Sequence, residues 1–134
     1  VHRVGLVAAR LVPDVRVIEA TMNRDAFVRM LQAARAAGAE LNGPDGDEVE
    51  FDPDGPADDG NPIGTPESEL TLSVDVSAHL DAKRNAMRCH RSQIEDTSFF
   101  LQMPDDAFAQ SFGTEWFIEH DAQPPVRSGW IFSN

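Results

Sequence analysis

The side chains that could carry chemistry are four histidines, one cysteine and many carboxylates. A protein metal site needs three or so ligands of the His, Cys, Asp or Glu type that converge in space. His79 and His90 are eleven positions apart on one predicted helix, which places them about 16 Å apart along its axis. They therefore cannot share an ion, and we interpret His90 as a structural group that hydrogen bonds beside a packed face.

Cys89 stands beside His90, an order that suggests a nucleophile and its base. Neighbouring residues of a helix point about 100° apart, however. Cys89 also falls on a face of small side chains that we expect to be buried, made of Ala82, Ala86, Cys89 and Gln93. The sequence has no GxSxG, no glycine-rich phosphate loop and no HExxH. The residues alone therefore give no complete catalytic constellation.

The segment 40–66 is rich in Gly, Pro, Asp and Glu, and eight carboxylates lie between Asp45 and Asp59. Their spacing does not match a calcium loop, which needs oxygens at positions 1, 3 and 5 and a bidentate Glu at position 12. The segment also has too few apolar residues to bury. We expect an acidic, solvated loop within the domain, in preference to a metal site.

The 134 residues suffice for one domain, and the sequence has no apolar run long enough to span a membrane. There are 11 Lys and Arg against 23 Asp and Glu, a net charge of -12. This charge would repel nucleic acid and anionic membrane surfaces, so neither is expected as a partner. The single cysteine cannot form an internal disulfide and favours a cytoplasmic protein. Because the sequence begins at Val1 without a signal peptide, we expect it to start within a longer protein.

The apolar periodicity alternates between helix and strand, which is typical of an α/β domain. Asn23 is a predicted cap, with Gly38 at the end of the helix that it starts. Ser77 is predicted to cap a helix that runs to about Gln93. The predicted elements are helix 2–11, strand 15–21, helix 23–38, strand 70–76, helix 77–93, helix 105–112, strand 114–120 and an extended tail, 123–134.

Residues 81–118 resemble the closing section of the PIG-L or LmbE-like family, zinc-dependent enzymes that remove N-acetyl or related acyl groups from amino sugars. The resemblance rests on KRNAMRCHRSQ at 83–93, SFF at 98–100, MPDDAF at 103–108 and FGTEWF at 112–117. Upstream, VHRVGLVAARL at 1–11 is similar to a helix of the family, and 17–25 and 63–76 are similar to its next two strands. The resemblance thus covers the chain apart from the 40–62 loop and the tail.

The resemblance implies that residues 1–134 are the C-terminal part of one deacetylase domain, of the mycothiol-related actinobacterial type. The implied fold is Rossmann-like and three-layered, with a mostly parallel sheet. The family's metal ligands and general base belong to AHPDDE and HPDH motifs, which this sequence lacks. We therefore expect zinc in the intact protein, and neither a catalytic residue nor bound zinc in this chain alone.

Sites of such sheets lie beyond the carboxyl ends of strands. Thr21, Asn23 and Arg24 follow a predicted strand and are our candidates for contacts with sugar hydroxyls, although Asn23 could equally be a helix cap alone. His2 is implied to be a further histidine that follows the last zinc ligand. We expect His2, His90 and Gln93 to support the site from behind or to hold the fold.

The resemblance implies an enzyme, a hydrolase of a carbon–nitrogen amide bond, that acts on an amino sugar or a glycoconjugate. One alternative is an amidase acting on a thiol conjugate, as mycothiol-related members do. Another is a non-catalytic α/β remnant that acts by association, which would include a homo-oligomer. The sequence does not discriminate among the three.

Overall fold

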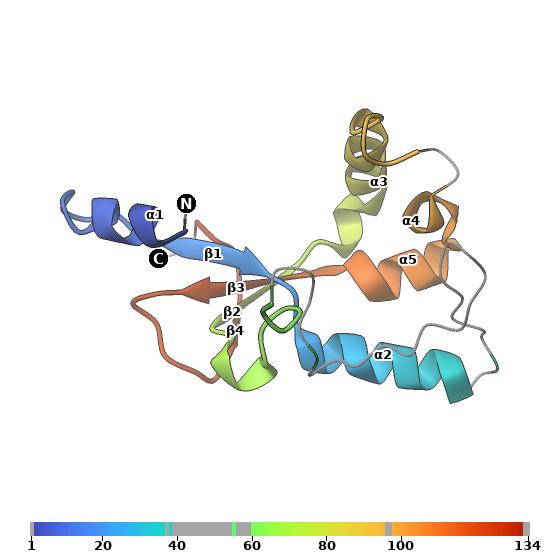
Figure 1. Ribbon diagram of the computed structural model, residues 1–134, viewed down its shortest axis with the longest axis horizontal. Coiled ribbons are helices and arrows are strands. Elements are labelled where there is room, and N and C mark those ends of the chain that lie inside the picture. The colour runs from blue at the N-terminus through green and yellow to red at the C-terminus, as the bar shows by residue number, and fades with distance from the viewer. Residues whose placement is uncertain (1, 37, 39–54, 56–59, 96–97, 133–134) are drawn as a thin grey trace. The chain divides into compact units, whose positions relative to one another are not determined.

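The computed structural model describes residues 2–36, 38, 55, 60–95 and 98–132 (Figure 1). The described residues form a mixed α/β arrangement with one four-stranded sheet, as the apolar periodicity predicted. The chain divides into two compact units, Val1–Leu72 with Trp116–Arg127, and Ser73–Glu115 with Ser128–Asn134. Most of the acidic segment 40–66 lies outside the described residues.

The first unit contains the helix α1 (His2–Ala9), the strand β1 (Ile18–Thr21), the helix α2 (Arg24–Ala36) and the 3-10 helix η1 (Glu67–Glu69). The strand is shorter than the predicted 15–21. Asp14, just before the predicted strand, has a φ of 62°, a left-handed conformation that an aspartate tolerates better than most residues. Gly38 has a φ of 81° after α2, as predicted for a glycine at a helix end.

The second unit carries the helical elements that follow strand β2 (Leu72–Asp75). They are η2 (Ser77–His79), α3 (Leu80–Cys89), α4 (Phe99–Gln102) and α5 (Asp105–Phe112). The predicted cap at Ser77 is wrong, because a 3-10 turn comes first and α3 begins only at Leu80. The Ser77 N–H instead donates to Asp75 Oδ1 at 2.9 Å. The hydrogen bonds from Ser77 lower the pKa of Asp75 below its ordinary value.

The strand order in the sheet is β1-β3-β2-β4, with β3 at Thr114–Glu119 and β4 at Arg127–Ser128. β1 pairs antiparallel with β3. The Thr71 N–H donates to Phe117 O and the Val76 N–H to Gly113 O, so the pairing on the other side of β3 is antiparallel too. The expectation of a mostly parallel sheet is therefore wrong for the described strands, because two of the three pairings are antiparallel.

The residues of β4 lie within the tail that was expected to be extended. Arg127 N–H donates to Thr71 O at 3.0 Å and Gly129 N–H donates to Ser73 O at 3.1 Å. Both sequence numbers rise together, so β4 runs parallel to β2.

Among the described residues, those of β2 and those just before it are the best buried. In the first unit Leu70 and Leu72 are fully buried, and in the second unit Val74, Leu101 and Phe108 are 3%, 6% and 1% exposed. Each such side chain contributes about 1.5–3 kcal/mol by leaving water. The alternation of LTLSVDV predicted this strand because its leucines and valine share one face.

The small-residue face of α3 differs from expectation. Ala82, Ala86 and Cys89 are exposed, and α3 ends before Gln93, which lies in a following turn. The half-buried side chains of α3 are instead Leu80, Lys83, Arg84 and Met87. The prediction that Cys89 is buried is wrong for this chain, because the packing of α3 in its own unit uses the face that carries the two cations. None of the described helices has the length and apolarity needed to cross a bilayer.

Candidate functional site

The first strand turns into the second helix at the residues that the sequence singled out, and a second segment of chain runs beside this turn. Asn23 and Thr65 form a parallel bridge. Thr65 N–H donates to Met22 O at 2.8 Å, and Arg24 N–H donates to Thr65 O at 3.0 Å. The two hydroxyl oxygens of Thr21 and Thr65 lie 2.7 Å apart. We call residues 21–24 and 63–65 the β1–α2 junction.

Arg24 fixes this junction with its guanidinium group. Its Nε donates to Ile63 O at 2.9 Å and its Nη2 donates to Gly64 O at 3.1 Å. Two consecutive carbonyl groups thus share one planar fork of donors, a geometry that lysine cannot supply. In the described structure, Arg24 is therefore a group that holds the 63–65 segment against the start of α2.

Asn23 is both a helix cap and a buried polar residue. Its Oδ1 accepts the N–H of Ala26 at 2.9 Å, so the predicted cap is present. The residue is 2% exposed, and its Nδ2 has no hydrogen-bond partner within the described structure. A buried donor without an acceptor costs about 1–3 kcal/mol. The two N–H groups of the Asn23 side chain are therefore unpaired at the end of β1.

Gly64 allows the two segments to approach so closely. Its φ is 64°, and a Cβ at this position would lie 2.5 Å from Met22 O. A larger residue would therefore meet both a left-handed backbone and a backbone carbonyl. Beyond it, Asp25 Oδ2 accepts Glu67 N–H at 2.7 Å, while Arg29 Nη2 bonds Glu67 Oε2 at 2.9 Å.

A charge cluster of the first unit surrounds Glu119, on β3. Its Oε2 lies 2.9 Å from Arg127 Nη2, and its Oε1 lies 2.6 Å from Arg16 Nη2. Hydrogen bonds from Arg127 and then Arg16 lower the pKa of Glu119, and they outweigh the opposite effect of burial. On the neighbouring strand, Glu19 Oε2 lies 3.1 Å from His120 Nε2. These pairs hold the β1–β3 ladder together.

The second unit has a clamp that joins two helices. Lys83 Nζ donates to Phe112 O at 3.0 Å and pairs with Glu115 Oε1 at 2.9 Å. Arg84 donates from Nη2 to Met103 O at 3.2 Å, and its Nη1 pairs with Asp105 Oδ1 at 3.0 Å. Adjacent cations of α3 thus hold both ends of α5. We call Lys83 and Arg84, with these partners, the α3–α5 clamp.

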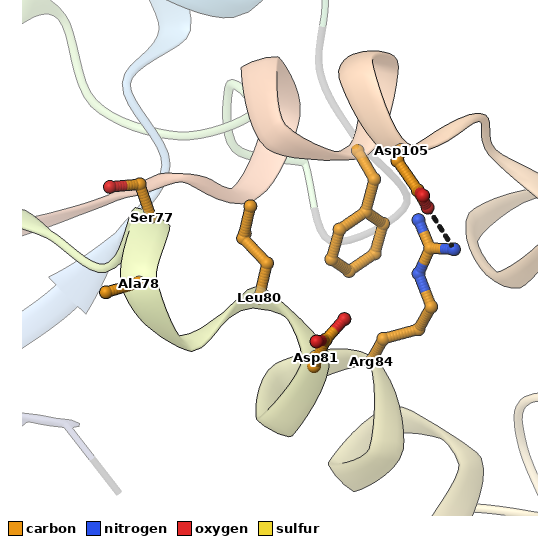
Figure 2. A pocket seen from close by; sticks show the side chains of 7 residues that line it. Ser77, Ala78, Leu80, Asp81, Arg84 and Asp105 are labelled. Carbon is orange, nitrogen blue, oxygen red and sulfur yellow. Dashed lines mark ion pairs between the residues drawn. The ribbon is translucent and has the colours of Figure 1, made fainter.

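A pocket of about 250 Å³ lies beside this clamp (Figure 2). Arg84 crosses its wall towards Asp105, with the guanidinium carbon 4.2 Å from the ring centroid of Phe108. Leu80 lines the apolar part and Asp81 contributes a carboxylate from α3. Arg84, Asp105 and the Phe108 ring thus interact with one another. This wall of the pocket is therefore formed by a stabilising contact.

Three further residues that the sequence suggested, His2, His90 and Gln93, are not part of the junction. His2 is the first residue of α1. His90 follows the last residue of α3, is exposed, and accepts through its backbone oxygen from Gln93 N–H and Ile94 N–H. Gln93 is exposed too. The supporting roles proposed for these three side chains remain predictions.

The described residues include no group of three His, Cys, Asp or Glu side chains that could hold a metal ion. At the junction the polar groups are two hydroxyls, an amide and a guanidinium. Zinc sites in proteins use imidazole, thiolate and carboxylate ligands, so the junction does not fit zinc. Its chemistry suits recognition of hydroxyl groups on a neutral polar molecule, because the threonine hydroxyls can both donate and accept.

Sequence reasoning missed the partners of the junction, Ile63, Gly64 and Thr65. The Gly-Thr-Pro sequence at 64–66 is a turn signal. It carries no information about which strand the turn lies beside, because the contacts join residues 40 and 44 positions apart.

Comparison with known proteins finds three similar proteins with one name, 1D-myo-inositol 2-acetamido-2-deoxy-alpha-D-glucopyranoside deacetylase. The Acidothermus cellulolyticus protein is 29% identical over 119 residues, 87% of this chain and 38% of that protein. The Thermomonospora curvata protein is 38% identical over 70 residues, 49% of this chain and 24% of that protein. The Nocardioides sp. protein is 34% identical over 67 residues, 50% of this chain and 21% of that protein.

This chain therefore spans well under half the length of the curated relatives that it matches. No protein-family model matches the chain. No solved structure matches it. The sequence similarity supports a relation to deacetylases of an acetamido sugar linked to inositol.

Proposed function

We propose that this chain is the C-terminal part of a hydrolase that removes an N-acetyl group from an amino-sugar glycoconjugate. The observation that carries the proposal is the similarity over 87% of the chain to a protein named as a deacetylase of an acetamido-glucopyranosyl inositol. The resemblance of 81–118 to PIG-L or LmbE-like enzymes agrees with it. The cytoplasm is the compartment that we propose, in keeping with the single cysteine.

The β1–α2 junction is the part of this chain that we assign to the substrate. Hydroxyl groups of a sugar or an inositol are both donors and acceptors, and the part-buried hydroxyl pair of Thr21 and Thr65 can match them in both roles. The Nδ2 group of Asn23 is buried, so it would reach a substrate only if the junction opened. Arg24 keeps those groups in place through its two bonds to carbonyl oxygens. The proposed role of the junction is thus to orient the substrate, and it holds or moves no proton of the reaction.

Zinc is proposed as the cofactor on the resemblance alone. Bound zinc supplies an activated water for amide hydrolysis. Since the described donors do not fit zinc, we assign the metal ligands and the general base to protein outside the described residues. No step of the hydrolysis is assigned to a side chain of this chain.

The proposal is tested by acetate release from 1D-myo-inositol 2-acetamido-2-deoxy-alpha-D-glucopyranoside. The assay uses this chain alone and a chimaera in which the chain replaces the matched segment of the Acidothermus relative. We expect turnover by the chimaera, its loss on chelation and recovery with zinc, and no turnover by the chain alone. Cleavage of a thiol-conjugate amide in place of the acetamide would favour the amidase. A folded, zinc-loaded chimaera that cleaves neither would refute a hydrolase.

The role of the junction is tested in the same chimaera with Thr21→Val, which removes a hydroxyl and keeps the shape of the side chain. We expect KM to rise about fivefold to tenfold with a smaller change in kcat, since one hydrogen bond contributes about 0.5–1.5 kcal/mol. Ser111→Ala is the matched control, because it removes a hydroxyl bonded to Ala107 O in the other unit. An unchanged KM for Thr21→Val would remove the junction from the site.

A further inference from the structure

The pocket beside the α3–α5 clamp has no part in the proposed function. It encloses about 250 Å³ between the first residues of α3 and the helix α5 (Figure 2). Its lining residues belong to 77–84 and 105–108, which lie within the second unit. Sites for drug-sized ligands enclose about 300–1,000 Å³. This pocket therefore has room for a molecule about the size of one sugar ring.

The lining of the pocket combines an apolar part with charged groups. Leu80 is half-buried and Phe108 is 1% exposed. Asp81 and Asp105 contribute two carboxylates, and Arg84 contributes one guanidinium group. Apolar walls with a few charged groups are typical of sites for small molecules. The two carboxylates outnumber the single cation, so the lining carries an excess of negative charge.

Arg84 is held against one wall of the pocket by three contacts. Its Nη1 pairs with Asp105 Oδ1 at 3.0 Å, and its Nη2 donates to Met103 O at 3.2 Å. Its guanidinium carbon lies 4.2 Å from the centroid of the Phe108 ring. Because the cation already has these contacts, it does not neutralise the second carboxylate of the pocket.

Asp81 is that second carboxylate. Among the described residues, its side chain has neither a hydrogen bond nor an ion pair. Figure 2 shows it between Leu80 and Arg84, on the side of α3 that lines the pocket. An ionised carboxylate only accepts hydrogen bonds, and its bonds to cationic donors are the stronger ones. A ligand that satisfies Asp81 therefore brings donors and a positive charge.

We propose that this pocket binds a protonated amino sugar, the product of the proposed deacetylation, with the ammonium group of the sugar on Asp81. The inference rests on the proposed function. Hydrolysis adds water across the amide bond and releases acetate and an amine, which takes up a proton because amines have a pKa of about 8 or higher. An ammonium group has three donors and no acceptor. The N-acetyl substrate carries a neutral amide instead, so the pocket selects the product over the substrate.

Two further features favour a small organic cation as the occupant. The net charge of -12 attracts cations to the chain and repels anions. Leu80 offers an apolar surface on which the C–H groups of a sugar ring can pack. A bare metal ion fits less well, because no three His, Cys, Asp or Glu side chains of the described residues are grouped to hold one.

Titration with glucosamine at about pH 6, where the amine is protonated, tests the pocket through amide chemical shifts. We expect saturable changes in 77–84 and 105–108. N-acetylglucosamine has the same ring without the ammonium group and should bind at least fivefold more weakly. Equal affinities for the two sugars, or tighter binding of N-acetylglucosamine, would overturn the proposal. The titration is made with the chain and with the chimaera, and a lack of binding to both would overturn it too.

Asp81→Asn tests the partner of the ammonium group, because it removes the charge and keeps the shape of the side chain. We expect it to weaken glucosamine binding at least fivefold and to leave the melting temperature unchanged, since Asp81 is exposed. Asp106→Asn is the matched control, on an exposed carboxylate of α5 that does not line the pocket. Equal losses from both variants would assign the binding to the overall negative charge and refute the site.

The readouts separate this inference from the proposed function. Glucosamine binding that depends on Asp81, without acetate release by the chimaera, would keep the cation site and remove the deacetylase. Acetate release without glucosamine binding would keep the deacetylase and remove the product site.

Discussion

The β1–α2 junction and the α3–α5 clamp both use an arginine to hold backbone carbonyl oxygens, yet they differ in what they leave unsatisfied. Arg84 in the clamp also pairs with Asp105 and stacks on Phe108. The junction instead joins two backbone segments and encloses Asn23, whose Nδ2 is buried without a partner. Among the described residues the second unit also buries one atom without a partner, Ser98 Oγ, which is not part of the clamp. Of these two contacts, the junction is therefore the one that holds an unpaired buried donor.

The largest effect that we expect is a steric one at the junction. Gly64→Ala places a methyl group 2.5 Å from Met22 O at a φ of 64°, so we expect a loss of about 3 kcal/mol or more in the free energy of unfolding. Gly60→Ala is the control, because Gly60 also has a positive φ but open space around it. It should cost roughly 1–2 kcal/mol, from backbone conformation alone. Denaturant unfolding of both variants measures the difference, and equal losses would show that the junction is loosely packed.

Arg24→Ala removes both bonds to the 63–65 segment, and we expect a loss of about 2 kcal/mol, because hydrogen bonds from a charged donor are stronger than neutral ones. Arg24→Lys should recover less than half of this loss, since one ammonium cannot span two carbonyl oxygens in the same geometry. Arg29→Ala is the control on the exposed ion pair with Glu67 and should cost less than about 0.5 kcal/mol. Full recovery of stability by Arg24→Lys would contradict a role for the two-donor guanidinium geometry.

Arg84→Ala should cost about 1–2 kcal/mol, through the bond to Met103 O and the contact with the Phe108 ring. The ion pair adds little, because the side chain of Asp105 is 98% exposed. Asp105→Asn should therefore leave the thermal midpoint almost unchanged, as should Arg88→Ala on the exposed side of α3. If Asp105→Asn matched the loss from Arg84→Ala, the ion pair would be the main interaction.

The smallest effect is one of acid sensitivity. The folded-state pKa of Glu119 lies below its ordinary value of 4.5, so the stability that it adds is present above about pH 4.5 and is lost as the pH falls through the lowered pKa. Glu119→Gln should flatten the fall in unfolding free energy below pH 4.5, as followed by urea titrations at a series of pH values. A parallel pH profile for the variant would show that Arg127 and Arg16 add no stability through this carboxylate.

The sequence predicted elements best where one local signal decided the structure. The alternation of 70–76 predicted a strand, the cap at Asn23 predicted the start of α2, and α5 matches the predicted 105–112. Local signals failed where a competing interaction decided the outcome. Asp75 accepts the Ser77 N–H and a 3-10 turn replaces the first turn of the predicted helix.

Only one of the two segments of the candidate site could be predicted from the sequence. Thr21, Asn23 and Arg24 follow from the end of a strand and the start of a helix, which are adjacent in sequence. Their partners Gly64 and Thr65 follow from tertiary pairing, which no periodicity encodes. The resemblance strings KRNAMRCHRSQ, MPDDAF and FGTEWF overlap the α3–α5 clamp. The most recognisable part of the sequence thus maps to a stabilising contact.

The pairing of β1 with β3 has a consequence for how the chain is made. Arg16 and Glu119, which tie the two strands together, are 103 positions apart. A ribosome adds about 5–20 residues per second, so β1 emerges roughly 5–20 s before its partner strand exists. During that interval Ile18–Thr21 has no partner in β3, and a chaperone that shields short apolar segments would raise the yield of folded protein more than one that acts after release.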